Sequence, residues 1–138
     1  MFEGTVENRV TSLTLVNNTA KEVLFTVPAG ERWMLISAKY TNPDDVNRAV
    51  TLELHKEAAK TNYIKKYQSG TVNAGAIQQY PSGALANTTQ NQSAIPYELL
   101  GAGNTLRLYF AAGGASAGGT DADGIVITVL KKAARGAE

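Results

Sequence analysis

The chain has 138 residues, a formal net charge of +1 and no cysteine. The lack of cysteine excludes disulfide bonds and thiolate metal sites, and the nearly neutral charge argues against a protein that binds nucleic acid by neutralising its phosphates. The longest strongly apolar run, 125–130, is far shorter than the roughly 20 residues of a membrane helix. The first residues lack the basic start and apolar stretch of a secretory signal. We therefore expect a single domain without a membrane span or a leader.

Apolar and polar residues alternate along several segments that are separated by turn residues. Val50, Leu52 and Leu54 alternate with polar neighbours, which indicates a strand with one buried face. The segments 32–41 and 125–130 are apolar on both faces, so we expect them to be covered on both sides. These patterns predict strands near residues 9–16, 22–27, 32–41, 48–56, 61–68, 72–80, 94–99, 104–111 and 124–131.

One turn-and-strand phrase occurs twice. The segment 27–35 begins Val-Pro-Ala-Gly and continues as an apolar strand, and 100–108 repeats it loosely as Leu-Gly-Ala-Gly-Asn followed by a strand. Gly30 and Gly103 suit such tight turns because glycine has no Cβ and adopts positive φ at little cost. Further turns are expected at 17–18 and 42–45, and 57–60 forms either a turn or a single turn of helix.

Eight to nine short strands with regular turns predict an all-β fold. We expect a single antiparallel β-sandwich, more specifically a jelly roll, over residues 1–130. Residues 131–138 are basic and lack apolar periodicity. They are expected to form a C-terminal tail whose removal leaves the melting temperature nearly unchanged.

His55 is the only histidine, and Glu53 lies on the same face of its predicted strand. This pair is the one arrangement suited to orienting an imidazole for acid–base catalysis. The chain has no cysteine nucleophile and no serine in a Gly-x-Ser-x-Gly context. We therefore expect His55 to be a cross-strand surface residue and the protein not to be an enzyme.

Three other features have ordinary structural explanations. The segment 121–124, Asp-Ala-Asp-Gly, resembles the start of a calcium loop but leads directly into an apolar strand, so a turn is expected, with no metal or cofactor. Trp33 follows the first turn in a doubly apolar strand and is expected in the core, not in a sugar or peptide site. Lysines 56, 60, 65 and 66 predict a solvated face, or alternatively a surface that steers an acidic partner.

No charged residue occurs between Lys66 and Glu98, where amides, hydroxyls and tyrosines supply the polarity. Charge depletion is typical of interface cores, and tyrosine is enriched there. The alternative is an ordinary sandwich surface rich in Thr, Asn and Gln. We expect this stretch to project from the sandwich and dock on other subunits through Tyr67, Gln78, Gln79, Tyr80, Asn87, Gln90, Gln92 and Tyr97.

The order of turns and strands resembles small β-sandwich structural proteins of tailed bacteriophage virions, including capsid decoration (cement) proteins. The resemblance covers 23–130: the Val-Pro-Ala-Gly turn, the strand 48–54, a long polar excursion, the Gly-Ala-Gly-Asn turn into 106–108, and a final Ile/Val strand. It implies a non-enzymatic protein that binds the major capsid protein or other virion subunits and stabilises the capsid, often as a trimer. It implies no catalytic, metal or cofactor residue, and a location in the virion after assembly in the host bacterial cytoplasm.

Two alternative functions remain open. One is a phage tail or head–tail accessory protein, which would be present in a handful of copies per particle and not in lattice numbers. The other is a carbohydrate- or receptor-binding module, because jelly rolls commonly serve as lectins. The fold alone does not choose among these functions.

Overall fold

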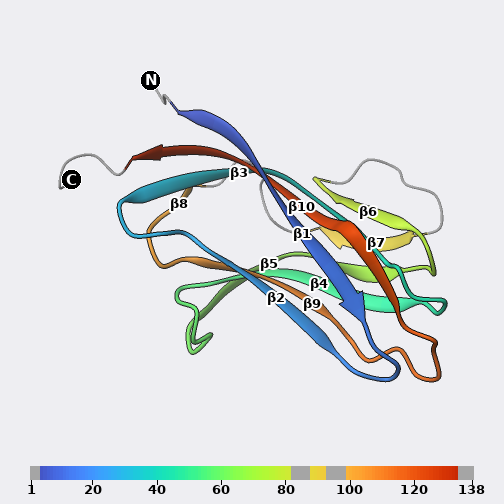
Figure 1. Ribbon diagram of the computed structural model, residues 1–138. Helices are drawn as coiled ribbons and strands as arrows, with labels where there is room; N and C mark the ends of the chain where they lie inside the picture. Colours follow the sequence, from blue (N-terminus) through green and yellow to red (C-terminus); the bar gives the residue numbers. More distant parts are fainter. Residues whose placement is uncertain (1–3, 82–87, 93–98, 134–138) are drawn as a thin grey trace.

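The computed structural model describes residues 4–81, 88–92 and 99–133, and in these ranges it consists of β-strands, turns and loops without a helix (Figure 1). No helix that is long and apolar enough to cross a membrane occurs in these ranges. The strands are β1 (Thr5–Leu15), β2 (Lys21–Thr26), β3 (Glu31–Thr41), β4 (Arg48–His55), β5 (Tyr63–Val72), β6 (Ile77–Tyr80), β7 (Thr88–Gln92), β8 (Leu99–Leu100), β9 (Thr105–Phe110) and β10 (Gly119–Ala133).

The strands form two antiparallel sheets that pack against each other (Figure 1). The first sheet has the order β1-β10-β3-β6, with the short β8 also paired to β3. The second sheet has the order β2-β9-β4-β5-β7. The predicted all-β antiparallel sandwich is therefore confirmed.

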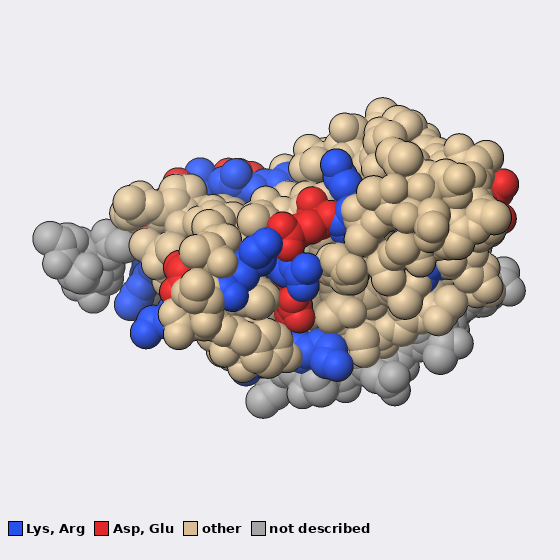
Figure 2. Space-filling model, turned by 90° about the horizontal axis from the view of Figure 1, so that it is seen from below, with Lys and Arg blue, Asp and Glu red and all other residues tan. Residues whose placement is uncertain are grey.

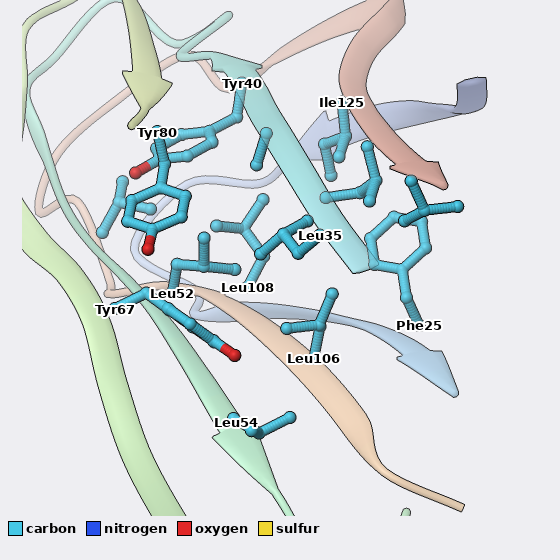
Figure 3. Packing of buried hydrophobic residues seen from close by; sticks show 14 of the residues in the cluster. Phe25, Leu35, Tyr40, Leu52, Leu54, Tyr67, Tyr80, Leu106, Leu108 and Ile125 are labelled. Atoms are coloured by element: carbon cyan, nitrogen blue, oxygen red, sulfur yellow. The ribbon is translucent and has the colours of Figure 1, made fainter. Parts of the chain in front are cut away.

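The core lies between the inner faces of the two sheets, as the alternation in the sequence predicts. Figure 3 shows Leu35 and Tyr40 of β3 directed toward Leu52 of β4 and Leu108 of β9. All four side chains are at most 1% exposed. Complete burial of one such apolar side chain contributes about 1.5–3 kcal/mol, so the core is the main source of stability.

The middle of the chain departs from the predicted strands. The predicted strands 61–68 and 72–80 are wrong in their division, because a single strand β5 runs from Tyr63 to Val72 and the turn follows at 73–76. Gly70 does not break this strand, since it pairs with Val50 of β4 on one side and Gln90 of β7 on the other. β7 was not predicted, and most of the predicted strand 94–99 lies outside the described residues.

The segment 121–124 is not the expected turn, because it lies inside β10. Between the pairs Thr11↔Ile125 and Leu13↔Asp121, a single residue of β1 faces three residues of β10, so the segment forms a bulge. A Cβ at Gly124 would lie 2.8 Å from the Cβ of Leu13, which explains why glycine occupies this position. The strand therefore absorbs the extra residues without ending.

β10 also extends further than predicted at its C-terminal end. The strand was expected to end near residue 131, with the tail beginning there, but the ladder continues to Ala133. Lys131 pairs with Thr5 of β1 on one side and Trp33 of β3 on the other. Of the expected tail, the first three residues thus belong to the sheet, and 134–138 lie outside the described residues.

The two copies of the repeated phrase form turns that are hydrogen-bonded to each other. Gly30 and Gly103 have φ of 82° and 87°, as predicted for tight glycine turns. The amide of Val27 donates to the carbonyl of Asn104, and the amide of Gly103 donates to the carbonyl of Val27, both at 2.9 Å. The repeated phrase therefore fastens the β2–β3 connection to the β8–β9 connection.

A buried ion pair holds three connections together at one end of the sandwich. The guanidinium of Arg48 lies 2.6 Å from the carboxylate of Asp44, and both side chains are fully buried. The same guanidinium donates to the carbonyls of Val16, Thr19 and Ala111 at 2.8–2.9 Å. One side chain thereby joins the β1–β2, β3–β4 and β9–β10 connections.

Candidate functional site

A group of charged side chains joined by ion pairs lies on the outer face of the second sheet. Glu53 of β4 is directly opposite Arg107 of β9, and Glu22 of β2 is opposite Tyr109, two pairs further along β9. The guanidinium of Arg107 donates to a carboxylate oxygen of Glu53 and to one of Glu22, each at 2.5 Å. Figure 2 shows acidic and basic side chains intermingled on this side of the molecule, surrounded by mostly uncharged surface.

Lys60 and Tyr109 complete the charged group. Lys60, from the β4–β5 connection, donates to both carboxylate oxygens of Glu22 at 2.7 and 2.8 Å. The guanidinium of Arg107 also lies 4.4 Å from the ring centroid of Tyr109, in a cation–π contact. Glu22, Glu53, Lys60 and Arg107 are named the charged cluster below, and two anions balance two cations in it.

The cluster holds its carboxyl groups in the ionised form. The hydrogen bond from Lys60, aided by Arg107, lowers the pKa of Glu22 despite partial burial. Burial alone would raise the pKa of Glu53, but hydrogen bonds from Arg107 and His55 outweigh it and lower the pKa. A general acid needs a pKa near the working pH, so these contacts favour a structural ion-pair network.

His55 is adjacent to the cluster but is not the surface residue expected from the sequence. The side chain is buried, with Nε2 3.1 Å from the carboxylate of Glu53. The ring of Tyr63 covers it edge-on at 5.6 Å between centroids. Nδ1 has no hydrogen-bond partner within the described part of the chain. The sequence shows the Glu53–His55 pairing, but the covering by Tyr63 depends on the β4–β5 register.

Several residues of the predicted docking stretch lie inside the sandwich. Tyr67, Gln78 and Tyr80 are at most 2% exposed, so they are core residues of the single chain and not an interface. Figure 3 shows Tyr67 and Tyr80 within the core. Gln79 is exposed on β6. For Gln90 and Gln92, which lie on β7, only the backbone is described, and Asn87 and Tyr97 lie outside the described residues.

Gln68 is compatible with the core because its amide finds partners there, whereas neither amide atom of the buried Gln78 has a hydrogen-bond partner among the described residues. Gln68 accepts a short hydrogen bond from the hydroxyl of Tyr40 and donates to the carbonyl of Gln79 at 2.9 Å. Tyr67 and Tyr80 pack edge-to-face with centroids 5.3 Å apart. Hydrogen bonding removes most of the cost of burying a polar group, so Gln68 and its partners form a polar part of the core.

The remaining candidates have structural roles. Trp33 is 1% exposed, as predicted for a core residue, and its indole N–H donates to Glu31 at 3.0 Å. Asp121 accepts from the backbone amide of Asp123 at 2.9 Å within the bulge. No group of three or more metal-binding side chains, and no pocket, is found in the ranges that the structure describes.

Sequence reasoning missed an apolar surface on the outer face of the first sheet. Val6 of β1 pairs with Leu130 of β10, Leu130 pairs with Met34 of β3, and Met34 pairs with Leu99 of β8. These four residues, named the apolar row, cross four strands side by side, and Val6 and Leu99 are 62% and 52% exposed. Alternation from Val6 onward is the sequence signal that would have revealed the start of this strand.

Comparison with models of known protein families gives no match, and comparison with curated proteins gives none. The fold and the site therefore define the class of protein as an antiparallel β-sandwich. One outer face carries the charged cluster and the other carries the apolar row.

Proposed function

We propose that this chain is a non-enzymatic structural protein of a virion, which binds an assembled capsid and stabilises it. The observation that carries the proposal is the apolar row, an uncharged line of side chains across four strands, exposed at Val6 and Leu99 and half-buried at Leu130 and Met34. Contiguous exposed apolar residues are typical of surfaces that bind another protein. In a lattice of many copies, modest affinity at each contact is sufficient, because neighbouring contacts reinforce one another.

The strand order supports the finer prediction of a jelly roll. The ladder partners nest from the ends of the chain inward: β1 with β10, β2 with β9, β3 with β6, and β4 with β5. Such nesting is the arrangement expected when one long antiparallel ribbon is wound into two sheets, as in the jelly rolls of viral capsid proteins. This agreement extends the resemblance noted in the sequence beyond its turns.

Co-sedimentation with capsids that lack this chain tests the proposed function. The wild-type chain should pellet with the capsids in a fixed ratio to the capsid subunits. Leu99→Glu should reduce binding at least tenfold, because it places a charge in the apolar row. Leu24→Glu is the matched control, since Leu24 is 37% exposed on the outer face of the second sheet. Failure of the wild-type chain to pellet at every salt concentration would refute capsid binding.

The copy number per particle separates the capsid from the tail. A number matching the capsid lattice supports decoration, and a handful of copies supports the alternative of a tail or head–tail accessory protein. Quantitative mass spectrometry of purified virions gives this number directly.

One observation favours a carbohydrate-binding module as a second candidate. Tyr63 is 54% exposed next to the charged cluster, so an aromatic ring and hydrogen-bonding carboxylates lie together on an open sheet face. Aromatic faces and carboxylates are suitable groups for binding a sugar. Glycan-array binding that is lost in Tyr63→Ala would support this candidate, and an array without hits would exclude it for the glycans present.

A further inference from the structure

β1 is an 11-residue strand with one free edge. Its only ladder in the described part of the chain is with β10, so the opposite row of amides and carbonyls carries no strand. Val6 and Val10 are 62% and 52% exposed on its outer side. Long apolar edge strands are the sites at which sheets extend by pairing with another strand.

The sequence of this edge is nearly palindromic. Residues 5–11 read Thr-Val-Glu-Asn-Arg-Val-Thr, so the order is the same in both directions except that Glu7 is exchanged for Arg9. A palindromic strand pairs antiparallel with a second copy of itself about a two-fold axis through its central residue, here Asn8. Each threonine and each valine then faces a residue of the same type in the partner, Asn8 faces Asn8, and each glutamate faces an arginine.

We propose that two copies of this chain pair antiparallel along β1, about a two-fold axis at Asn8, to form a dimer with a continuous sheet. In this register Val6 faces the partner's Val10, and Glu7 faces the partner's Arg9. Valine pairs, threonine pairs and opposite charges are all favourable directly across an antiparallel ladder. The contact is isologous, so it closes at two chains.

The neighbouring registers are less favourable. An axis at Glu7 places two glutamates opposite each other, and an axis at Arg9 places two arginines opposite each other, which is destabilising. A shift by one residue of either strand alone would set outward side chains against inward ones, which the pleat does not allow. The charges therefore select the register centred on Asn8.

The side chains around Glu7 and Arg9 suit this pairing. Within one chain, the carboxylate of Glu7 accepts from Arg9 at 2.8 Å and from Lys131 at 3.0 Å. Nε of Arg9 is buried and has no hydrogen-bond partner among the residues described. The guanidinium of Arg9 also stacks 4.6 Å from the ring centroid of Trp33, which holds it in place, and in the dimer the partner's Glu7 places a second carboxylate opposite Arg9.

The dimer goes beyond the proposed function and does not depend on it. It would join the first sheets of two copies into one. Each apolar row would then continue from Val6 to the partner's Val10. Its test uses the isolated chain, whereas the test of capsid binding uses particles. A monomer that still pellets with capsids would refute the dimer alone.

A single introduced cysteine tests the register directly, because the chain has none of its own. Residues that face each other in an antiparallel pair have Cα atoms about 4.5–5.5 Å apart, which is within the range for a disulfide. Asn8→Cys should therefore form a covalent dimer rapidly under mild oxidation. Ser12→Cys, on the same outer face, is the matched control, since its own copy would be roughly 27 Å away. Equal rates for the two variants would overturn the proposal.

Charge reversal gives an independent test that does not require a disulfide. Glu7→Arg makes the strand doubly positive and Arg9→Glu makes it doubly negative, so each variant alone should be monomeric by native mass spectrometry. An equal mixture of the two should restore the dimer, because opposite charges then face each other at both positions. Lys39→Glu, an exposed charge reversal on β3, should leave the dimer intact.

The outcomes that refute the dimer are a wild-type mass of one chain over the whole dilution series, or a mass of three chains. The second result would favour the trimer that the family resemblance implies. A mixture of the charge-reversed variants that stays monomeric, while both melt as cooperatively as the wild type, would also refute the pairing.

Discussion

Arg48 combines a complete ion pair with contacts to three separate connections. Removing a buried guanidinium leaves Asp44 buried without its counter-ion, and breaking such a pair costs about 3–5 kcal/mol. Arg48→Ala should therefore lower the free energy of unfolding by this amount, measured by urea denaturation. Arg48→Lys should lose part of it, because an ammonium has no planar fork to reach the carbonyls of Val16, Thr19 and Ala111.

The control for this prediction is Arg32→Ala, because Arg32 is exposed on β3. Exposed substitutions usually change stability by less than about 0.5 kcal/mol. A loss below 1 kcal/mol in Arg48→Ala would contradict the proposed role of the ion pair.

The lowered pKa of Asp44 should make the free energy of unfolding fall as the pH is lowered. Burial alone would raise its pKa, but hydrogen bonds from Arg48 and from the amide of Asp45 lower it from 3.8 to about 2. Because the folded pKa is below the unfolded one, this stabilisation is complete above the unfolded pKa and is lost as the pH falls toward the folded pKa. Between pH 4 and pH 2, Asp44→Asn should lose less stability than the wild type in urea titrations. Parallel losses in the two proteins would contradict this expectation.

At the residue scale, the sequence indicated some side chains correctly and misjudged others. The burial of Trp33 follows from its place in a doubly apolar strand, so it was predictable. The burial of Gln68 and Gln78 was not predictable from charge depletion. An amide is neutral both at an interface and in a core, and its environment depends on partners far along the chain, such as Tyr40.

At the element scale, the end of β10 determines where the chain is dispensable. The earlier expectation placed the tail after Leu130, but residues 131–133 pair with β1 and β3. Truncation after Ala133 should leave the melting temperature unchanged within about 1 °C. Truncation after Leu130 should lower it by about 3–4 °C per kcal/mol lost, because it removes ladder pairs and the Lys131–Glu7 ion pair. Equal melting temperatures would show that these pairs contribute no stability.

Most strands were predictable because the alternation of apolar and polar residues is contained within each strand's own sequence. β2, β3, β4 and β9 begin and end within about one residue of the predicted bounds. The errors fall where pairing overrides a local signal: Gly70 lies inside β5 because strands flank it on both sides, and 121–124 bulges because β1 continues past it. The apolar row also depends on register, which no single segment of sequence contains.

At the scale of the whole molecule, the first and last strands are neighbours. Thr5 pairs with Lys131, so the start of β1 and the end of β10 lie side by side (Figure 1). A permuted chain that joins Glu138 to Met1 and opens between Ala58 and Ala59, both exposed, should therefore fold to the same sandwich. Far-UV circular dichroism and a cooperative melt provide the measurement.

Opening the chain between Pro43 and Asp44 is the matched comparison. That position adjoins the buried Arg48–Asp44 pair, so this permutant should melt at a much lower temperature or fail to fold. Equal stability of the two permutants would contradict the distinction between them.

The two interlocked glycine turns have a consequence for the dynamics of the protein. Because Val27 and Gly103 each donate across to the other turn, neither amide can exchange with solvent until both connections separate. The two amides should therefore show the same hydrogen-exchange protection, as a single opening unit. Gly103→Ala, which strains a φ of 87°, should accelerate the exchange of both amides. Gly101→Ala, where an added Cβ meets nothing closer than 3.9 Å, should leave both rates unchanged.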